Sequence, residues 1–245
     1  MTLLRFSGVS DRGPSGKLWQ GLVDWTKGTL AVSNGVVDVD DFWPYNAGNF
    51  TLSGDSGSAA TVTAVPFGVL SITATQAADA VSGYQRNSYV DLTSIREVCI
   101  ETSLDPTDDN DTTQTFVGFT DEALDGFFGS DNTPDGSAIG VRWNGDETFD
   151  LIAIDASDVI TVLADAFATV ARTAGNCLIG CRIKRTSATN YQVIGSVNGA
   201  TVKVNTTSSV VPQVAMLPSV IHTNDNEAAP LFTNDWVAVI DYTPA

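Results

Sequence analysis

The sequence has few of the residues on which most enzyme sites depend. It contains one histidine, three cysteines and two methionines among 245 residues. A hydrolytic triad needs a histidine beside its nucleophile, but no Gly-x-Ser-x-Gly elbow accompanies His222. A phosphate loop with its lysine and a dinucleotide-binding fingerprint are also missing. We therefore expect that His222 is a solvent-facing loop residue, that the protein is not an enzyme and that it binds no cofactor.

Basic residues are scarce as well. The chain has 12 Lys and Arg against 29 Asp and Glu, which gives a net charge of −17. Because this charge repels both nucleic-acid phosphate and anionic lipid, we expect no direct binding to nucleic acid or membrane. The sequence also lacks an apolar run of the ~18 residues that a membrane span needs, and its N-terminus lacks the apolar core of a signal peptide. We expect the protein to be made and kept in a cytoplasm.

The three cysteines are too few and too irregularly spaced for a disulfide framework or a zinc site. Three residues separate Cys177 from Cys181, where zinc knuckles usually have two. We expect these two residues and Cys99 to be buried, reduced and packed as small hydrophobic side chains.

From about residue 50 the chain is a series of short β-type stretches separated by turn residues. In REVCIETSL, Val98 and Ile100 alternate with Glu97, Cys99 and Glu101, so the two sets face opposite sides of a strand. Such stretches recur with no convincing amphipathic helix between them. This pattern predicts a sandwich or a barrel.

Two turns between these stretches predict β-hairpins. Asn198-Gly199 lies between two β-rich runs, which is typical of a two-residue hairpin loop with positive φ at both residues. WNGDETF, at 143–149, joins two further runs, and we expect it to do so in the same manner. ADAFATVARTAG, at 164–175, is the one stretch that could instead form a short helix turn.

The first 45 residues differ from the rest, because they show no sustained period yet contain three of the five tryptophans. A flexible leader with Trp19, Trp25 and Trp43 would expose a large apolar area. We therefore expect these residues, with Tyr45, to cover a surface of this chain's sandwich or of a neighbour's. The predicted organisation is an N-terminal arm over 1–45 and one domain over 46–245.

The order of four segments resembles the concanavalin A-like jelly roll found in lectins, laminin-G-type modules and many phage virion proteins. These segments are FVGFTDE, IGVRWNGDETFDL, YQVIGSVNGATVKV and WVAVIDYT. The end of the chain is particularly similar to phage structural proteins, with Pro218, an acidic loop from His222 to Glu227 and a final strand ending in Asp241-Tyr242. The resemblance implies an all-β fold of two antiparallel sheets.

The same resemblance implies a function in assembly. Our leading hypothesis is a non-enzymatic phage capsid decoration or cement protein, assembled in the host cytoplasm and forming a homotrimer on a shell of major capsid protein. Its interface residues would be Trp19, Trp25, Trp43 and Tyr45, because large aromatics anchor subunit contacts. The alternative is a glycan-binding module of a tail fibre or receptor-binding protein.

A third hypothesis is a glucanase. Glu97-Val-Cys-Ile-Glu101 resembles the Glu-x-Asp-x-Glu strand motif of laminarinase- and lichenase-type enzymes, with Glu97 and Glu101 at the outer positions. Two carboxylates on one strand face could supply a retaining pair. However, Cys99 replaces the middle Asp, so we expect two solvated strand glutamates and no catalysis.

Two acidic stretches remain. DPTDDNDTT contains Asp105, Asp108, Asp109 and Asp111, which are calcium-type ligands, but it lacks the EF-hand glycine and glutamate. Because Asp and Asn also cap their own turns, we expect a solvated turn and no metal, with calcium left open.

In FVGFTDEALDGFF, at 116–128, we expect a core strand, then a loop with Asp121, Glu122 and Asp125, then two buried phenylalanines. Any function of that loop would be contact with a partner.

Overall fold

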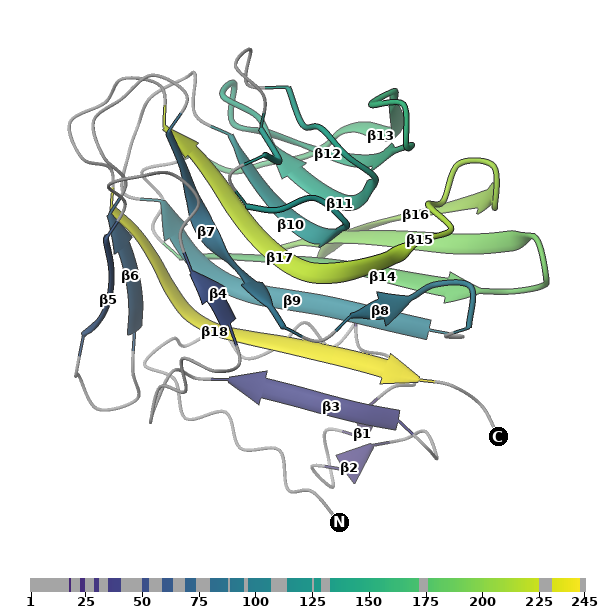
Figure 1. Ribbon diagram of the computed structural model, residues 1–245, viewed down its shortest axis with the longest axis horizontal. Coiled ribbons are helices and arrows are strands. Elements are labelled where there is room, and N and C mark those ends of the chain that lie inside the picture. Colours follow the sequence, from purple (N-terminus) through teal and green to yellow (C-terminus); the bar gives the residue numbers. More distant parts are fainter. Residues whose placement is uncertain are drawn as a thin grey trace.

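In a computed structural model the chain forms two antiparallel β-sheets packed face to face (Figure 1). The structure describes residues 18, 23–24, 29–30, 35–40, 50–52, 59–63, 69–73, 80–87, 89–94, 97–106, 114–124, 126–128, 133–171, 176–224 and 231–242. Within this part there is no helix with the length and hydrophobicity that a membrane span requires.

Sheet I has the strand order β13-β12-β11-β10-β17-β7-β4, with β8 paired beside β17. Its strands are β4 (Phe50–Leu52), β7 (Ala80–Arg86), β8 (Val90–Asp91), β10 (Thr115–Thr120), β11 (Ala138–Trp143), β12 (Thr148–Ile154), β13 (Ile160–Thr169) and β17 (Ala215–Asn224).

Sheet II has the order β16-β15-β14-β9-β18-β6-β5, with β3 paired beside β18. Its strands are β3 (Gly35–Asp40), β5 (Ala59–Thr63), β6 (Val69–Thr73), β9 (Glu97–Pro106), β14 (Cys177–Arg185), β15 (Asn190–Val197), β16 (Ala200–Thr207) and β18 (Leu231–Tyr242). A separate two-stranded ribbon joins β1 (Val23–Asp24) to β2 (Thr29–Leu30). The strand β3 lies within the segment 1–45, and it adds to sheet II.

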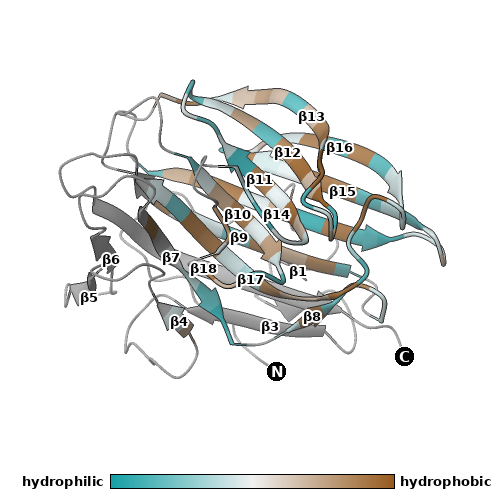
Figure 2. Cartoon of the chain, turned by 45° about the horizontal axis from the view of Figure 1, so that its top comes forward, coloured by the Kyte–Doolittle hydropathy of each residue, from teal (hydrophilic) through white to brown (hydrophobic). Residues whose placement is uncertain are grey.

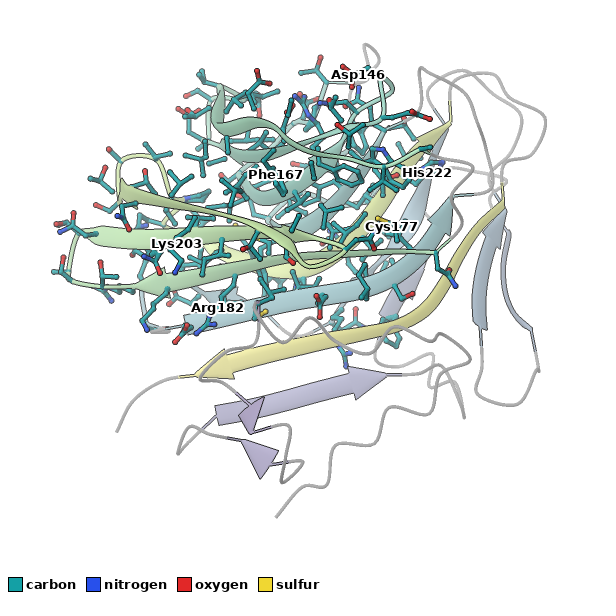
Figure 3. The ribbon with its side chains drawn as sticks, turned by 180° about the vertical axis from the view of Figure 1, so that it is seen from behind. Asp146, Phe167, Cys177, Arg182, Lys203 and His222 are labelled. Carbon is teal, nitrogen blue, oxygen red and sulfur yellow. The ribbon has the colours of Figure 1, made fainter. Side chains whose placement is uncertain are left out.

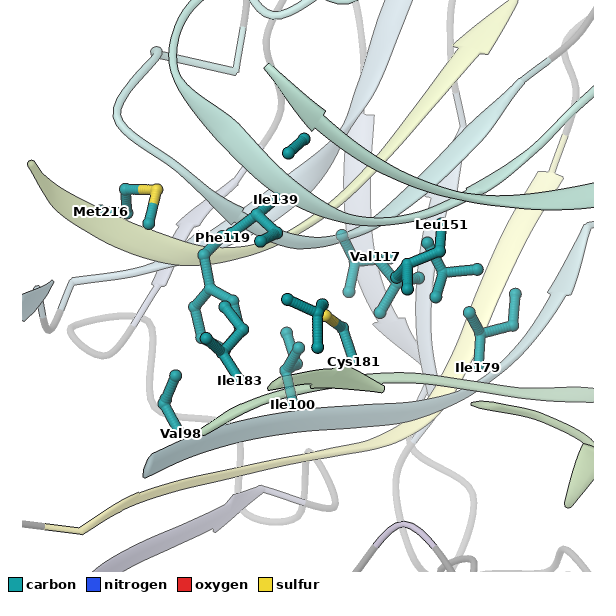
Figure 4. Close-up of a cluster of buried hydrophobic side chains, with 14 of the residues drawn as sticks. Val98, Ile100, Val117, Phe119, Ile139, Leu151, Ile179, Cys181, Ile183 and Met216 are labelled. Atoms are coloured by element: carbon teal, nitrogen blue, oxygen red, sulfur yellow. The ribbon is translucent and has the colours of Figure 1, made fainter. Parts of the chain in front are cut away.

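The main hydrophobic core lies between the two sheets (Figure 4). Val98 and Ile100 of β9 face it from sheet II, while Val117 and Phe119 of β10 face it from sheet I, as the two-residue period requires. The predicted alternation along β9 is therefore confirmed. The hydroxyl groups of Tyr84 and Thr102 hydrogen-bond across the core at 3.3 Å and tie β7 to β9.

Two predictions about connections have different outcomes. Asn198 and Gly199 have φ values of 49° and 83° and join β15 to β16, so the predicted two-residue hairpin is confirmed. The strands β11 and β12 also form a hairpin, but its loop is four residues long and Glu147, with φ of 64°, has the positive angle. Its geometry therefore differs from that of the first hairpin.

The helical alternative for 164–175 is wrong over its first six residues, which belong to the strand β13. Pairing with β12 satisfies the backbone of this alanine-rich stretch and overrides its local helix propensity. The strand pairing shifts register near Asp150, and Ala166 has a positive φ of 43°. Its N–H donates to Asp150 Oδ1 at 2.9 Å, so the irregular position keeps a hydrogen-bond partner.

All three cysteines are buried and none of them forms a disulfide, as the sequence predicts. Cys177 and Cys181 contribute to the main core, while Cys99 lies on the opposite face of β9. Burial raises the pKa of the Cys181 thiol, and burial together with the negative charge of Glu101 raises that of Cys99. Both thiols stay protonated at neutral pH and are therefore weak nucleophiles.

We predict that a thiol reagent such as DTNB leaves the native protein unmodified over minutes at pH 8. All three thiols should react as soon as urea unfolds the chain, because only unfolding exposes them. Absorbance at 412 nm measures both reactions. Rapid labelling of one thiol in the native protein would contradict this burial.

Candidate functional site

A second hydrophobic cluster lies on the outer face of sheet I, away from the main core. Phe116 of β10 packs against Phe127 with ring centroids 4.6 Å apart, and Phe127 against Phe128 at 4.9 Å. A Cβ atom added to Gly118 or Gly140 would lie 2.7 Å from the tip of the Phe116 ring, so this ring lies across both glycines. The loop after β10 thus covers the middle of this face, and the predicted strand, loop and buried phenylalanines are confirmed.

The acidic residues of this loop hold its turns. Asp121 Oδ1 accepts the Ser137 N–H at 2.7 Å, and the Glu122 N–H donates to Thr120 Oγ1 at 3.0 Å. The side-chain amide of Gln85 on β7 donates to the Glu122 carbonyl at 2.6 Å, which fixes the loop to the sheet. Across the part of the chain that the structure describes, no three His, Cys, Asp or Glu residues are grouped to hold a metal ion. Asp125 lies outside that part.

A polar group, which we call the Asp150 cluster, lies beside this loop on the same face and consists of Arg142, Asn144 and Asp150. Arg142 Nη2 donates to Asp150 Oδ2 at 2.9 Å, and Asn144 Nδ2 donates to the same oxygen at 2.7 Å. The Asp150 side chain is 5% exposed and that of Arg142 is 17% exposed. Arg142 and Asn144 are therefore held in place by a buried carboxylate while part of their surface remains accessible.

The pKa of Asp150 reflects two opposing effects. Burial alone would raise it, but the hydrogen bonds from Ala166, Asn144 and Arg142 and the charge of Arg142 hold the pKa below its ordinary value.

On the other side of the hairpin, Trp143 and Phe149 stack in the main core with ring centroids 4.8 Å apart. This stacking fixes the hairpin that carries the cluster.

Sequence reasoning missed the Asp150 cluster. A usable signal was present, because the expected hairpin over 143–149 places Arg142 opposite Asp150 on adjacent strands. Sequence reasoning also missed Tyr89, which is 68% exposed. Its neighbour Val90 faces the main core, so alternation directs Tyr89 to the outer side of sheet I.

The two glutamates of the glucanase hypothesis lie on the other sheet and are buried, so the prediction that they are solvated is wrong. Glu97 is 5% exposed and Glu101 is fully buried. Arg182 Nε donates to Glu97 Oε1 at 2.6 Å, and Lys184 Nζ lies 3.9 Å from Glu97 Oε2. The reason is cross-strand pairing with β14, which places basic side chains next to a strand that the sequence pattern treats alone.

Leu18 covers this charged group. It is fully buried, and its carbonyl accepts a hydrogen bond from Arg182 Nη1 at 2.7 Å (Figure 3 labels Arg182). Gly180, on the same face of β14, leaves the space for its side chain, since an added Cβ would lie 2.4 Å from Leu18 Cδ2. We call this contact the Leu18 seat. It places one residue of the segment 1–45 on sheet II of the same chain.

The prediction for His222 is also wrong. It belongs to β17 and is 1% exposed, and its Nδ1 lies 2.9 Å from Thr115 Oγ1 on the neighbouring strand (Figure 3). The turn-like composition of HTNDNE suggested a loop, but pairing with β7 and β10 extends the strand to Asn224.

Several predicted site residues lie outside the part that the structure describes. These are Trp19, Trp25, Trp43 and Tyr45 of the arm, and Asp108, Asp109 and Asp111 of the acidic stretch. The backbone of Asp105 is described as part of β9. The hypotheses of an aromatic interface and of a calcium site therefore stay predictions.

No family model matches this chain, and no curated protein matches it either. Among solved structures, a protein of unknown function from Shewanella oneidensis is similar over 96% of both chains, with 14% identity and a TM-score of 0.56. The endo-β-1,4-glucuronan lyase of the fungus Trichoderma reesei has 11% identity and a TM-score of 0.57, over 86% of this chain and 96% of the lyase. A family 16 glycoside hydrolase of Bacteroides ovatus, in complex with a mixed-linkage glucan product, has 10% identity and a TM-score of 0.56, over 82% of this chain and 99% of the enzyme.

These likenesses show the fold, which is the concanavalin A-like jelly roll that the sequence predicts. At such low identity they show the fold alone. None of these three structures is described as a virion protein. The capsid hypothesis, with its homotrimer and shell partner, therefore stays a prediction without support.

We predict that Gly180→Ala displaces Leu18, because the added Cβ would overlap Leu18 Cδ2. The Cβ would also lie 2.8 Å from the Ile100 carbonyl oxygen, so the backbone on its other side prevents it from moving away from the leucine. Trypsin should then cut the Lys17–Leu18 bond faster than in the wild type, and mass spectrometry would detect the new N-terminus. Gly195→Ala is the matched control, since its Cβ would meet side chains alone, the Phe167 ring at 3.0 Å and Val202 Cγ1 at 3.3 Å. Equal cleavage rates in the two variants would refute the Leu18 seat.

We predict that Asp150→Asn lowers the free energy of unfolding by about 2 kcal/mol at pH 7, because it weakens hydrogen bonds to a buried charged acceptor. Since the folded pKa is below the unfolded one, the carboxylate stabilises the fold above the ordinary Asp pKa of about 3.9, and this effect disappears as the pH falls through the folded pKa. The free energies of unfolding of the wild type and the variant, measured with urea, should therefore become equal in acid. Asp165→Asn, an exposed change on β13, should show no such difference at either pH.

Proposed function

We propose that this protein binds a carbohydrate chain, without cleaving it, on the outer face of sheet I. The observation that carries the proposal is the Asp150 cluster, in which a buried carboxylate orients a guanidinium and an amide beside an accessible surface. Such planar polar groups form paired hydrogen bonds with vicinal hydroxyls, and rigid support lowers the entropic cost of binding.

Two of the similar structures support this choice of ligand. The lyase is described as acting on a glucuronan, and the hydrolase is described in complex with a mixed-linkage glucan product. Because one fold hosts many functions, this support is an analogy, and the Asp150 cluster is the evidence from the chain itself.

Binding without cleavage fits the chemistry of the described carboxylates. A retaining glycosidase needs two carboxyl groups about 5 to 5.5 Å apart that both reach the substrate. Glu97 and Glu101 are buried on the other sheet, and Asp150 is engaged by three hydrogen-bond donors. The exposed Asp146 accepts hydrogen bonds from the backbone and hydroxyl of Thr148, which gives it a role in the turn.

We predict that a mixed-linkage gluco-oligosaccharide or a glucuronan oligosaccharide binds this protein, and that Asn144→Ala weakens the binding about tenfold. The reason is the loss of one oriented hydrogen-bonding group, worth about 1.4 kcal/mol. Titration calorimetry would measure both affinities. A reducing-end assay with the same sugars should detect no product.

Asn176→Ala is the matched control, because Asn176 is an exposed asparagine that immediately precedes β14 of sheet II. It should bind as the wild type does. The absence of binding to any glycan on an array, or equal losses in the Asn144 and Asn176 variants, would refute the proposal. New reducing ends would instead show an enzyme.

A further inference from the structure

The acidic residues are distributed very unevenly along the chain. Residues 166–224 contain no Asp or Glu and five of the 12 basic residues, so this stretch has a net charge of +5. The rest of the chain has all 29 acidic residues and seven basic ones, which gives −22. A long stretch of this acidic chain is therefore basic. Such an uneven distribution of charge along the sequence indicates a charge-dependent contact.

The fold gathers much of this stretch on one side of the molecule. The strands β14, β15 and β16 lie next to one another at the end of sheet II, and β16 is its last strand. In β16, Val202 and Val204 pack against the main core, while Thr201, Lys203 and Thr207 are exposed on the outer side. Figure 2 shows this alternation of hydrophobic and hydrophilic residues, and Figure 3 labels Lys203.

Two lysines of this side have accessible side chains, whereas Arg182 is buried and its charge is matched by Glu97. The Lys203 side chain is exposed, and that of Lys184 is 39% exposed, with its nearest carboxylate oxygen 3.9 Å away. Lys203 on β16 lies opposite Ile194 of β15, which in turn lies opposite Arg182 of β14. Lys184 is two residues further along β14, so the two lysines are separated by two strand spacings and two residues, or roughly 12 Å. Arg185 is not part of this face, because it lies on the core side of β14 with Ile183 and donates to the carbonyl of Thr93 in the turn after β8.

We propose that the outer face of β14–β16, with Lys184 and Lys203, is a second binding site, for an anionic polysaccharide that carries carboxylate or sulfate groups. It lies on the opposite sheet from the site proposed above and does not depend on it. Charge complementarity requires an anionic partner, since repulsion keeps such a partner away from the acidic remainder of the chain.

The composition of the face favours a polysaccharide over a protein or a nucleic acid. Protein interfaces need buried apolar anchors, but the large hydrophobic side chains that are exposed in the described part are Tyr89, Val159, Val162 and Val214, none of which is on β14–β16. Single-stranded nucleic acid needs aromatic side chains for stacking, which this face also lacks. Its exposed neutral side chains, such as Thr201 and Thr207, can hydrogen-bond to sugar hydroxyls.

Affinity chromatography on immobilised heparin at low ionic strength, with polygalacturonate as a second probe in solution, tests the proposal. The wild type should be retained on heparin despite its net charge of −17 and should elute as salt screens the contact. Lys184→Gln/Lys203→Gln should elute earlier and bind polygalacturonate about tenfold more weakly, because two charge contacts are lost. Thermal unfolding would check that this variant remains folded.

The matched control is Ala156→Glu/Thr161→Glu, which changes two exposed residues on and beside β13. Both double variants change the net charge from −17 to −19, so a position-dependent effect separates them. The control should elute with the wild type. Failure of the wild type to bind either probe, or equal losses in the two variants, would overturn the proposal. Equally tight binding of single-stranded DNA at the same lysines would also overturn the assignment to a polysaccharide.

Discussion

The structure depends on the burial of alternate side chains between two antiparallel sheets. Each long central strand contributes every second residue to one shared core, so sheet I and sheet II can bury their inner faces only against each other. The Tyr84–Thr102 hydrogen bond satisfies two polar groups inside this layer without interrupting it. The Asp150 cluster and the Leu18 seat both lie on the outer faces that this packing leaves.

Part of each outer face is covered by the chain itself. On sheet I, Phe127 and Phe128 fold back onto Phe116, and on sheet II, Leu18 lies over the pair of Glu97 and Arg182. A buried ion pair contributes little net stability, because desolvation offsets its attraction, but it disfavours any arrangement that leaves one charge unpaired. The ion pair of Glu97 and Arg182 therefore favours one position of Leu18, whose carbonyl accepts a hydrogen bond from Arg182.

The remaining accessible surface is divided by its chemistry. Sheet I presents oriented hydrogen-bonding groups around Asp150, while the end of sheet II presents two accessible lysines, Lys203 and Lys184, of which Lys184 lies 3.9 Å from Glu97 Oε2. A strongly acidic chain repels anions over most of its surface, so a local excess of positive charge restricts where an anionic ligand can approach. The two faces thus suit different ligands, although the same core supports both.

The sequence by itself determined the fold class, the alternation along β9, the Asn198-Gly199 hairpin and the buried cysteines, because these depend on local periodicity and turn chemistry. It could not determine the burial of Glu97 and His222 or the strand state of 164–169. Those features depend on which strand lies alongside, and pairings such as β9 with β14 or β10 with β17 join residues 73 to 107 positions apart. Only the tertiary structure brings Arg182 to Glu97 and Thr115 to His222, since hydrogen bonding between distant strands, and no local pattern, decides their environment.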